Sequence, residues 1–183
     1  MNLLSDYLRK QTSKVHQRIE RSSWSQAVLN DEMQTKDYGT WLQNFHSFLA
    51  SCEYQVQVSG ILDGADIPFI NRSNLISLDL EQIGLKPSPN QHILSDLNAW
   101  ACLYVMEGSQ MGGLTLFRHL NANCSIPKNA LNYFGYELRM RPKRWLKVQG
   151  LLNTVTESDH DKIASDAITC FERLDSSMQP QIQ

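Results

Sequence analysis

Apolar residues recur at intervals of three and four along most of this chain, and no alternation of apolar and polar residues persists for six residues. The first pattern gives a helix one apolar face, whereas a half-buried strand requires strict alternation. We therefore predict an all-α fold, with helices at residues 3–21, 36–58, 75–84, 90–120, 128–135, 141–153 and 157–177. The segment 60–74 has turn residues without periodicity and is expected to be an extended connection.

The first predicted helix carries one buried stripe and a histidine beside it. The stripe falls at intervals of four, four, three and four, and consists of Leu4, Leu8, Thr12, Val15 and Ile19. His16 lies at the border between this stripe and solvent, where a neutral imidazole can bind iron if its other nitrogen has a fixed partner. Glu20, one turn later, is placed to be that partner. A histidine at such a border is also common as an ordinary surface or core residue, so a second site has to decide.

A second unusual segment is Tyr104–Leu116, where apolar residues keep helical spacing although Gly108, Gly112 and Gly113 fall within six residues. Glycine inside a helix costs about 1 kcal/mol relative to alanine, so this density needs a reason. One reason is a flat, bulky ligand that comes close to the backbone, because Gly108 and Gly112 share one helix face. The alternative is close packing of two helices through small residues.

Composition and charge narrow the class of protein. A chain of 183 residues with 42% apolar residues is typical of one domain, which we expect to span residues 1–183. A formal charge of −2 gives no basic field of the kind that nucleic acid binding needs. No apolar run reaches the ~20 residues that cross a bilayer, and the first residues lack the apolar core of a signal peptide. These features predict a cytoplasmic protein that binds neither nucleic acid nor membrane.

The cysteines do not form a recognisable metal or disulfide pattern. Cys52, Cys102, Cys124 and Cys170 are widely scattered, and three of them fall within predicted helices. This distribution is typical of reduced thiols that serve as small core residues. The chain also has no HxH, HExxH or CxxC motif, so a closed zinc site is not expected.

Taken together, the two unusual segments resemble the haem oxygenase family, and specifically its small bacterial, biliverdin-forming branch. The first helix of that family carries L-[KR]-x-x-T-x-x-x-H-x-x-x-E, and Leu8, Arg9, Thr12, His16 and Glu20 occupy those places in order. The family's distal motif, G-[DS]-x-x-G-[GA], is matched by the six residues 108–113. A weaker match near the C-terminus places Phe171 where the family's last helix lines the haem pocket.

The resemblance implies a fold and a set of site residues. It implies one helical bundle that holds haem between a proximal N-terminal helix and a kinked, glycine-rich distal helix. It assigns His16 as the iron ligand. Haem-binding roles fall on Arg9, Thr12, Glu20, Gly113 and Phe171, with Arg9 directed at a propionate, and catalytic roles fall on Gly108, Ser109 and Gly112.

The resemblance also implies an activity, namely conversion of haem to biliverdin, CO and ferrous iron with O₂ and external electrons. The expected partners are haem, an electron donor such as ferredoxin or a reductase, and a bilin-binding photoreceptor as product acceptor. The alternative is a haem carrier or sensor without turnover. Two departures from the family motivate it: Ser109 stands where the animal branch has aspartate, and Arg141 with Pro142 replaces threonine and glycine.

Near this second departure, Arg141, Lys143, Arg144 and Lys147 form a basic cluster around Trp145. We expect it to be a solvated basic face, a set of propionate contacts or a docking surface for an acidic electron donor.

Overall fold

The computed structural model describes residues 3–88, 96–123 and 125–178, and all regular structure within these ranges is helical. The α-helices are α1 (Leu4–Glu20), α2 (Ser23–Leu29), α3 (Thr35–Ser59), α4 (Arg72–Gln82), α5 (Ala99–Ala122), α6 (Asn132–Gly135), α7 (Arg141–Leu152) and α8 (His160–Met178). Two short 3₁₀ turns, η1 (Lys128–Ala130) and η2 (Glu157–Asp159), precede α6 and α8. The all-α prediction is confirmed.

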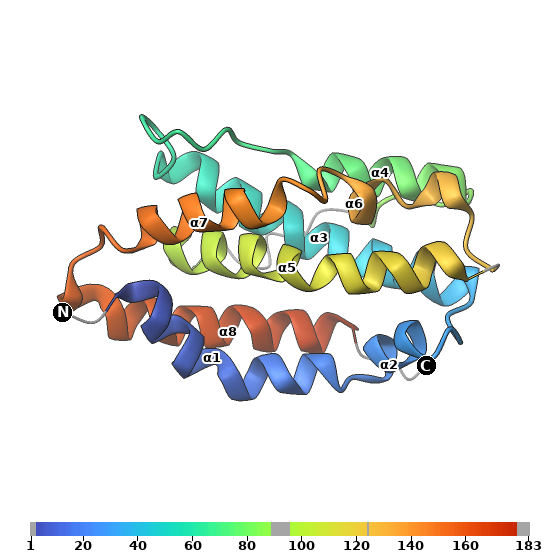
Figure 1. Cartoon of the computed structure of the whole chain (residues 1–183), viewed down its shortest axis with the longest axis horizontal. Helices are drawn as coiled ribbons and strands as arrows, with labels where there is room; N and C mark the ends of the chain where they lie inside the picture. The colour runs from blue at the N-terminus through green and yellow to red at the C-terminus, as the bar shows by residue number, and fades with distance from the viewer. Residues whose placement is uncertain (1–2, 89–95, 124, 179–183) are drawn as a thin grey trace.

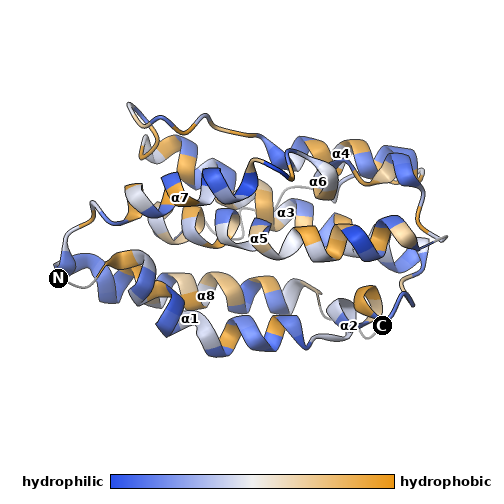
Figure 2. Ribbon diagram, viewed as in Figure 1, coloured by the Kyte–Doolittle hydropathy of each residue, from blue (hydrophilic) through white to orange (hydrophobic). Residues whose placement is uncertain are grey.

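Three long helices, α3, α5 and α8, pack against one another at the centre of the molecule. The helix α4 covers α3, α7 covers α5, and α1 lies along α8 at the opposite side of the bundle (Figure 1). The helices α1 and α8 run parallel, since Tyr7 bonds to Asp161 near their starts and Arg18 bonds to Asp175 near their ends. Figure 2 shows apolar and polar stretches alternating along the long helices, as expected of helices with one buried face.

The predicted helix boundaries differ from the structure at several points. The helix expected at 90–120 begins only at Ala99, because the Asn98 side chain accepts a hydrogen bond from the Trp100 amide and caps that end. Residues 96–98 are not helical, and 89–95 lie outside the described residues. Likewise α4 begins at Arg72 instead of residue 75, with Asn71 as its cap. The expected connection therefore ends three residues earlier.

The short helix α2 was not predicted. It has seven residues, and the Ser22 hydroxyl at its N-terminus accepts a hydrogen bond from the Ser25 amide. The segment 128–135 was predicted as one helix but consists of a 3₁₀ turn followed by four α-helical residues. Among the described residues, none of the helices is both long and apolar enough to cross a membrane.

Candidate functional site

A cavity of about 450 Å³ is lined by residues of α1, α2, α3, α5, α6 and α8. Most of its wall is apolar or aromatic. The lining residues are His16, Ile19, Glu20, Trp24, Ser25, Leu29, Trp41, Phe45, Ser109, Gln110, Gly112, Gly113, Thr115, Leu116, Tyr133, Phe134, Phe171, Leu174 and Met178. The cavity therefore brings the predicted histidine helix and the predicted glycine helix together.

His16 contributes the imidazole of this cavity from α1. Its Nδ1 lies 3.3 Å from Glu20 Oε1, one turn later on the same helix, as the spacing predicts. The Phe171 ring on α8 packs edge-on against the imidazole, with ring centroids 5.7 Å apart at 83°. Since Glu20 engages Nδ1, the neutral tautomer that suits this contact leaves Nε2 with a lone pair for a metal.

The three glycines of α5 have different surroundings. The helix runs continuously through all of them. A Cβ on Gly112 would meet no atom within 4 Å, so this glycine presents bare backbone to the cavity. A Cβ on Gly113 would collide with Nη1 of Arg141, and one on Gly108 would touch Trp145 at 3.5 Å. Packing of α7 therefore explains Gly113 and accounts for the contact at Gly108, whereas no protein atom among the described residues accounts for Gly112.

Two polar groups of the distal wall have defined hydrogen bonds. The Ser109 hydroxyl donates to the Met106 carbonyl at 2.9 Å, so toward the cavity it offers only lone pairs. The Gln110 amide donates to the Tyr133 hydroxyl at 2.5 Å, and both residues line the cavity. Burial raises the pKa of Tyr133 to about 12, so its hydroxyl stays protonated and can donate to a bound ligand or water.

Aromatic rings from three helices stack together in the cavity wall. Trp41 stacks on Trp24 at 4.1 Å, on Phe45 at 4.7 Å and on Phe134 at 5.5 Å between ring centroids. Trp41 Nε1 donates to the sulfur of Met178 at 2.8 Å. By contrast, the buried Nε1 of Trp24 has no partner among the described residues, so the cavity wall contains an indole N–H without an acceptor.

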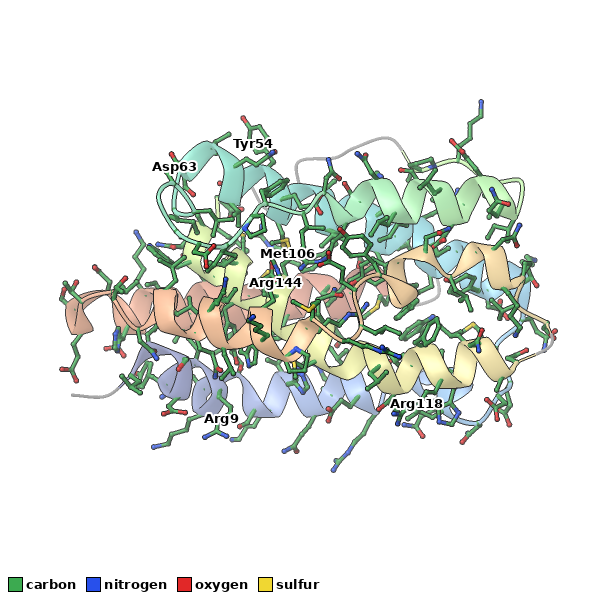
Figure 3. All side chains as sticks on the ribbon, turned by 45° about the horizontal axis from the view of Figure 1, so that its top comes forward. Arg9, Tyr54, Asp63, Met106, Arg118 and Arg144 are labelled. Carbon is green, nitrogen blue, oxygen red and sulfur yellow. The ribbon has the colours of Figure 1, made fainter. Side chains whose placement is uncertain are left out.

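Three of the predicted site residues do not line the cavity. Arg9 is 82% exposed and pairs with Asp6 at 3.3 Å, and Figure 3 shows it at the edge of the molecule. Thr12 is buried, donates to the Leu8 carbonyl and lies 3.2 Å from the Tyr104 hydroxyl of α5. Gly108 faces Trp145, as described above. His16, Glu20, Ser109, Gly112, Gly113 and Phe171 all lie in the lining.

The expectation of a solvated basic face around Trp145 is wrong for two of its members. The Arg141 guanidinium is buried and donates to the carbonyls of Gln110, Tyr133, Phe134 and Tyr136 at 2.9 to 3.3 Å. Arg144 forms a two-pronged ion pair with Glu107 at 2.7 and 2.9 Å, and Figure 3 labels it near the middle of the view. Lys147, which remains exposed, pairs with Asp66.

Sequence reasoning missed several of the cavity residues. Gln110 and Tyr133 lie on different helices, and their hydrogen bond follows only from the packing of α6 on α5. Trp24 lies on the helix that was not predicted. The available signal was the unusual aromatic content at Trp41 and Phe45, which helical spacing assigns to the core without distinguishing core from cavity wall.

These features fit a flat apolar molecule with a metal centre. The lining combines a histidine, bare backbone at Gly112 and many aromatic and apolar side chains. Haem is such a molecule, and its two carboxylates require cations, hydrogen-bond donors or solvent at its rim.

Comparison with known proteins agrees with this site. The family model described as "Heme oxygenase" matches residues 2–93, about half of the chain. No curated protein matches significantly.

Several solved structures share the fold. The heme oxygenase of Leptospira interrogans has a TM-score of 0.80 at 17% identity, covering 97% of this chain and 98% of its own. Heme oxygenase-2 of Synechocystis sp. PCC 6803, in complex with heme and NO, has a TM-score of 0.78 at 16% identity. The match covers 97% of this chain and 84% of that protein. The NO- and CO-bound heme oxygenase of Neisseria meningitidis has a TM-score of 0.78 at 17% identity, and the match covers 97% of this chain and 91% of that protein. From the family match and the shared fold, this chain belongs to the haem oxygenase family of haem-binding enzymes.

Proposed function

We propose that this enzyme converts haem to biliverdin, CO and ferrous iron, with O₂ as oxidant and electrons from an external donor. The observation that carries the proposal is one cavity that joins His16 on α1 to the bare backbone of Gly112 on α5. Haem is the substrate, and its iron supplies the centre at which O₂ is activated. The residues of the chain bind, orient and hydrate it.

On the proximal side, we assign His16 Nε2 as the iron ligand. The contact between Nδ1 and Glu20 at 3.3 Å supports this assignment, because it fixes the tautomer and orientation of the ring. Phe171 packs edge-on against the imidazole and limits its rotation. A neutral imidazole suits ring hydroxylation, since a thiolate ligand would favour O–O cleavage instead.

On the distal side, Gly112 lets the helix backbone approach the substrate and restricts where an oxygen ligand can tilt. Gly108 lets α7 pack on α5, and Gly113 leaves space for Arg141, so these two hold the helix in place. Ser109 accepts a hydrogen bond from a bound water, since its proton is already donated to Met106. The Tyr133 hydroxyl, which accepts a hydrogen bond from Gln110, donates its proton to the bound water in place of the Ser109 hydroxyl.

Two further assignments concern the contact that holds α1 against α5 and the residue that binds a propionate of haem. Thr12 joins α1 to α5 through Tyr104 and so sets the separation of the two walls. Arg9, which lies less than two turns before His16 on α1, is our proposed partner for a propionate at the solvent edge. Such an exposed ion pair is worth only about 0–1 kcal/mol, so its main effect is on the orientation of haem.

We further propose that a small iron–sulfur protein such as ferredoxin, or a flavin reductase, donates the electrons. The product then passes to a bilin-binding acceptor such as a photoreceptor. The exposed edge at Arg9, where the rim of the haem would face solvent, is where an electron donor approaches most closely.

The decisive experiment adds haemin to the purified chain, followed by a reductant under air. We expect the Soret band first to shift on binding and then to be replaced by the absorption of biliverdin, with CO released in equal amount. A shifted Soret band that persists through repeated reduction would show a haem carrier and overturn the catalytic proposal. A Soret band that does not shift at all would show that the chain does not bind haem.

A further inference from the structure

Three cysteines meet in the core at a point where α3, α5 and α8 pack together. Cys52, Cys102 and Cys170 are each fully buried, and their sulfur atoms all lie within 4.8 Å of one another. Cys52 Sγ and Cys170 Sγ are 4.0 Å apart although the residues are 118 positions apart in sequence. None of the three lines the haem cavity, so they form a separate cluster.

The size of this sulfur triangle matches a metal ion better than a disulfide. An ion in the plane of three sulfurs, with metal–sulfur bonds of about 2.3 Å, holds those sulfurs about 4.0 Å apart. The Cys52 and Cys170 sulfurs already have this separation, and the other two distances need to shorten by less than about 1 Å. A disulfide requires a separation of about 2.05 Å, which is a larger movement inside a packed core.

The local chemistry favours thiolate at one corner. Cys102 lies in the first turn of α5, where the helix dipole stabilises negative charge. The first turn of a helix also opens more readily than its middle, which gives an ion a route to the buried sulfurs.

We propose that Cys52, Cys102 and Cys170 form a binding site for one soft, thiophilic ion held by three sulfur ligands. Sulfur ligands select soft ions, and the described residues place no fourth histidine, cysteine or carboxylate within the cluster. Zinc, which prefers four ligands in structural sites, is therefore less suited than an ion that accepts three. Cuprous copper and trivalent arsenic are two ions that accept three sulfurs. Cuprous copper lies in the sulfur plane, whereas the lone pair of trivalent arsenic places it out of that plane and draws the sulfurs somewhat closer together.

The two ions differ in the charge that they leave in the core. Arsenite condenses with three thiols: three As–O bonds break, three As–S bonds form, and each thiol proton leaves in a water molecule, so the product is neutral. Cuprous ion displaces three protons to solvent and leaves a charge of −2. Arg173 on α8 lies near the cluster and offsets part of this negative charge. Asp166 also lies near it and adds to the charge, so the charge is only partly compensated. Because burying charge is costly, we expect arsenite to bind more tightly.

The test uses the full-length chain, reduced and without haem, titrated with arsenite or, in the absence of air, with cuprous ion from a weak complex. We expect one ion per chain for each, and weaker binding of Zn²⁺. X-ray absorption of the wild-type complexes should show one shell of three sulfur neighbours. Cys52→Ala, Cys102→Ala and Cys170→Ala should each lose stoichiometric binding. Cys124→Ser, which changes the fourth cysteine outside the described residues, should retain it.

Binding that persists in the alanine variants would overturn the proposal. So would oxygen or nitrogen neighbours in the wild-type complex, or tighter binding of Zn²⁺ than of both other ions. The wild-type measurements decide the matter even where an alanine variant fails to fold. Haem turnover is measured separately on the same samples, so failure of the thiol site and failure of the proposed haem reaction are distinguished.

Discussion

At the residue scale, two adjacent glycines of α5 serve different purposes. The Cβ of an alanine at 112 enters open space, whereas at 113 it collides with the Arg141 guanidinium, which bonds to four backbone carbonyls. The same substitution therefore has opposite consequences one position apart.

We predict that Gly112→Ala stabilises the protein by about 1 kcal/mol, because alanine is the better helix former. Gly113→Ala should instead be neutral to destabilising. Displacing Arg141 leaves buried polar groups unpaired at a cost of about 1–3 kcal/mol, which offsets the gain in helix propensity. Chemical denaturation of both variants and the wild type measures the two free energies of unfolding. Equal stabilisation by both would contradict the position of Arg141.

Replacing Gly112 by leucine tests whether this glycine faces the reacting haem. We expect Gly112→Leu to bind haem through His16 but to lose biliverdin formation, because the side chain fills the space that O₂ and water need. Gly150→Leu is the matched control, since Gly150 is a helical glycine with open space around it that does not line the cavity. Haem titration and biliverdin yield are the measurements. Full turnover by Gly112→Leu would remove this helix face from the distal pocket.

His16 provides the corresponding test on the opposite wall. His16→Ala should lose the spectrum of histidine-ligated haem and its turnover, and added imidazole should restore part of the spectrum by occupying the vacated space. Glu20→Gln should lower affinity or activity by about 10–100-fold, because only the partner of the ligand is altered. His119→Ala, which changes a histidine paired with Asp31 away from the cavity, serves as the control. An unchanged spectrum in His16→Ala without imidazole would disprove the assignment.

At the scale of the element, one buried carboxylate fixes the position of α5. Glu107, which immediately precedes the first glycine, forms ion pairs with Arg72 of α4 at 2.8 Å and with Arg144 of α7 at 2.7 Å. Burial disfavours the charged carboxylate, but the hydrogen bonds and charges of Arg144 and Arg72 outweigh this and lower the pKa of Glu107. The helix that contains the distal glycines is thus tied to both helices above it.

We predict that Glu107→Gln destabilises the fold by about 3–5 kcal/mol at neutral pH, since the buried Arg72 and the half-buried Arg144 lose the charge of Glu107. The pKa of Glu107 is lowered on folding, so its contribution is complete above the ordinary carboxyl pKa of 4.5 and is lost as the pH falls through the lowered value. The difference between wild type and variant should therefore shrink below about pH 4.5. Denaturation curves at several pH values measure it, and a constant difference would contradict the ion pairs.

At the scale of the whole molecule, the cavity depends on how α1 is held. Its principal packing partner is α8, with smaller contacts to α2 and α7, while α5 belongs to the central group of helices. The Thr12–Tyr104 contact is a direct link between the two walls. A ligand that binds both walls therefore adds to the stability of the assembled bundle.

Haem should consequently raise the melting temperature. A ligand that binds only the folded state, present at 1,000 times its Kd, adds about 4 kcal/mol. For a chain of this size, each kcal/mol corresponds to about 2–4 °C, so we expect a rise of about 8–16 °C. Thermal melting followed by circular dichroism measures this shift, and His16→Ala should reduce it. An equal shift in His16→Ala would mean that haem binds without this histidine.

Much of this architecture could be predicted because helical periodicity is a local property. The first helix was expected at 3–21 and lies at Leu4–Glu20, and the contact between His16 and Glu20 follows from their spacing alone. The missed helix and the wrong helix boundary also have local causes. The seven residues of α2 are too few to show a period, and the start of α5 is set by a cap at Asn98 that the preceding pattern obscured.

The sequence by itself determined the helical class, the family and the two segments that supply the histidine and the glycines of the cavity, because each motif consists of residues close together in the chain. Only the tertiary structure decided that Arg141 is buried under α5, that Gln110 holds Tyr133, and that three distant cysteines meet. Each of these contacts joins helices far apart in sequence. Their positions depend on how the helices pack, which the period of a single helix does not encode.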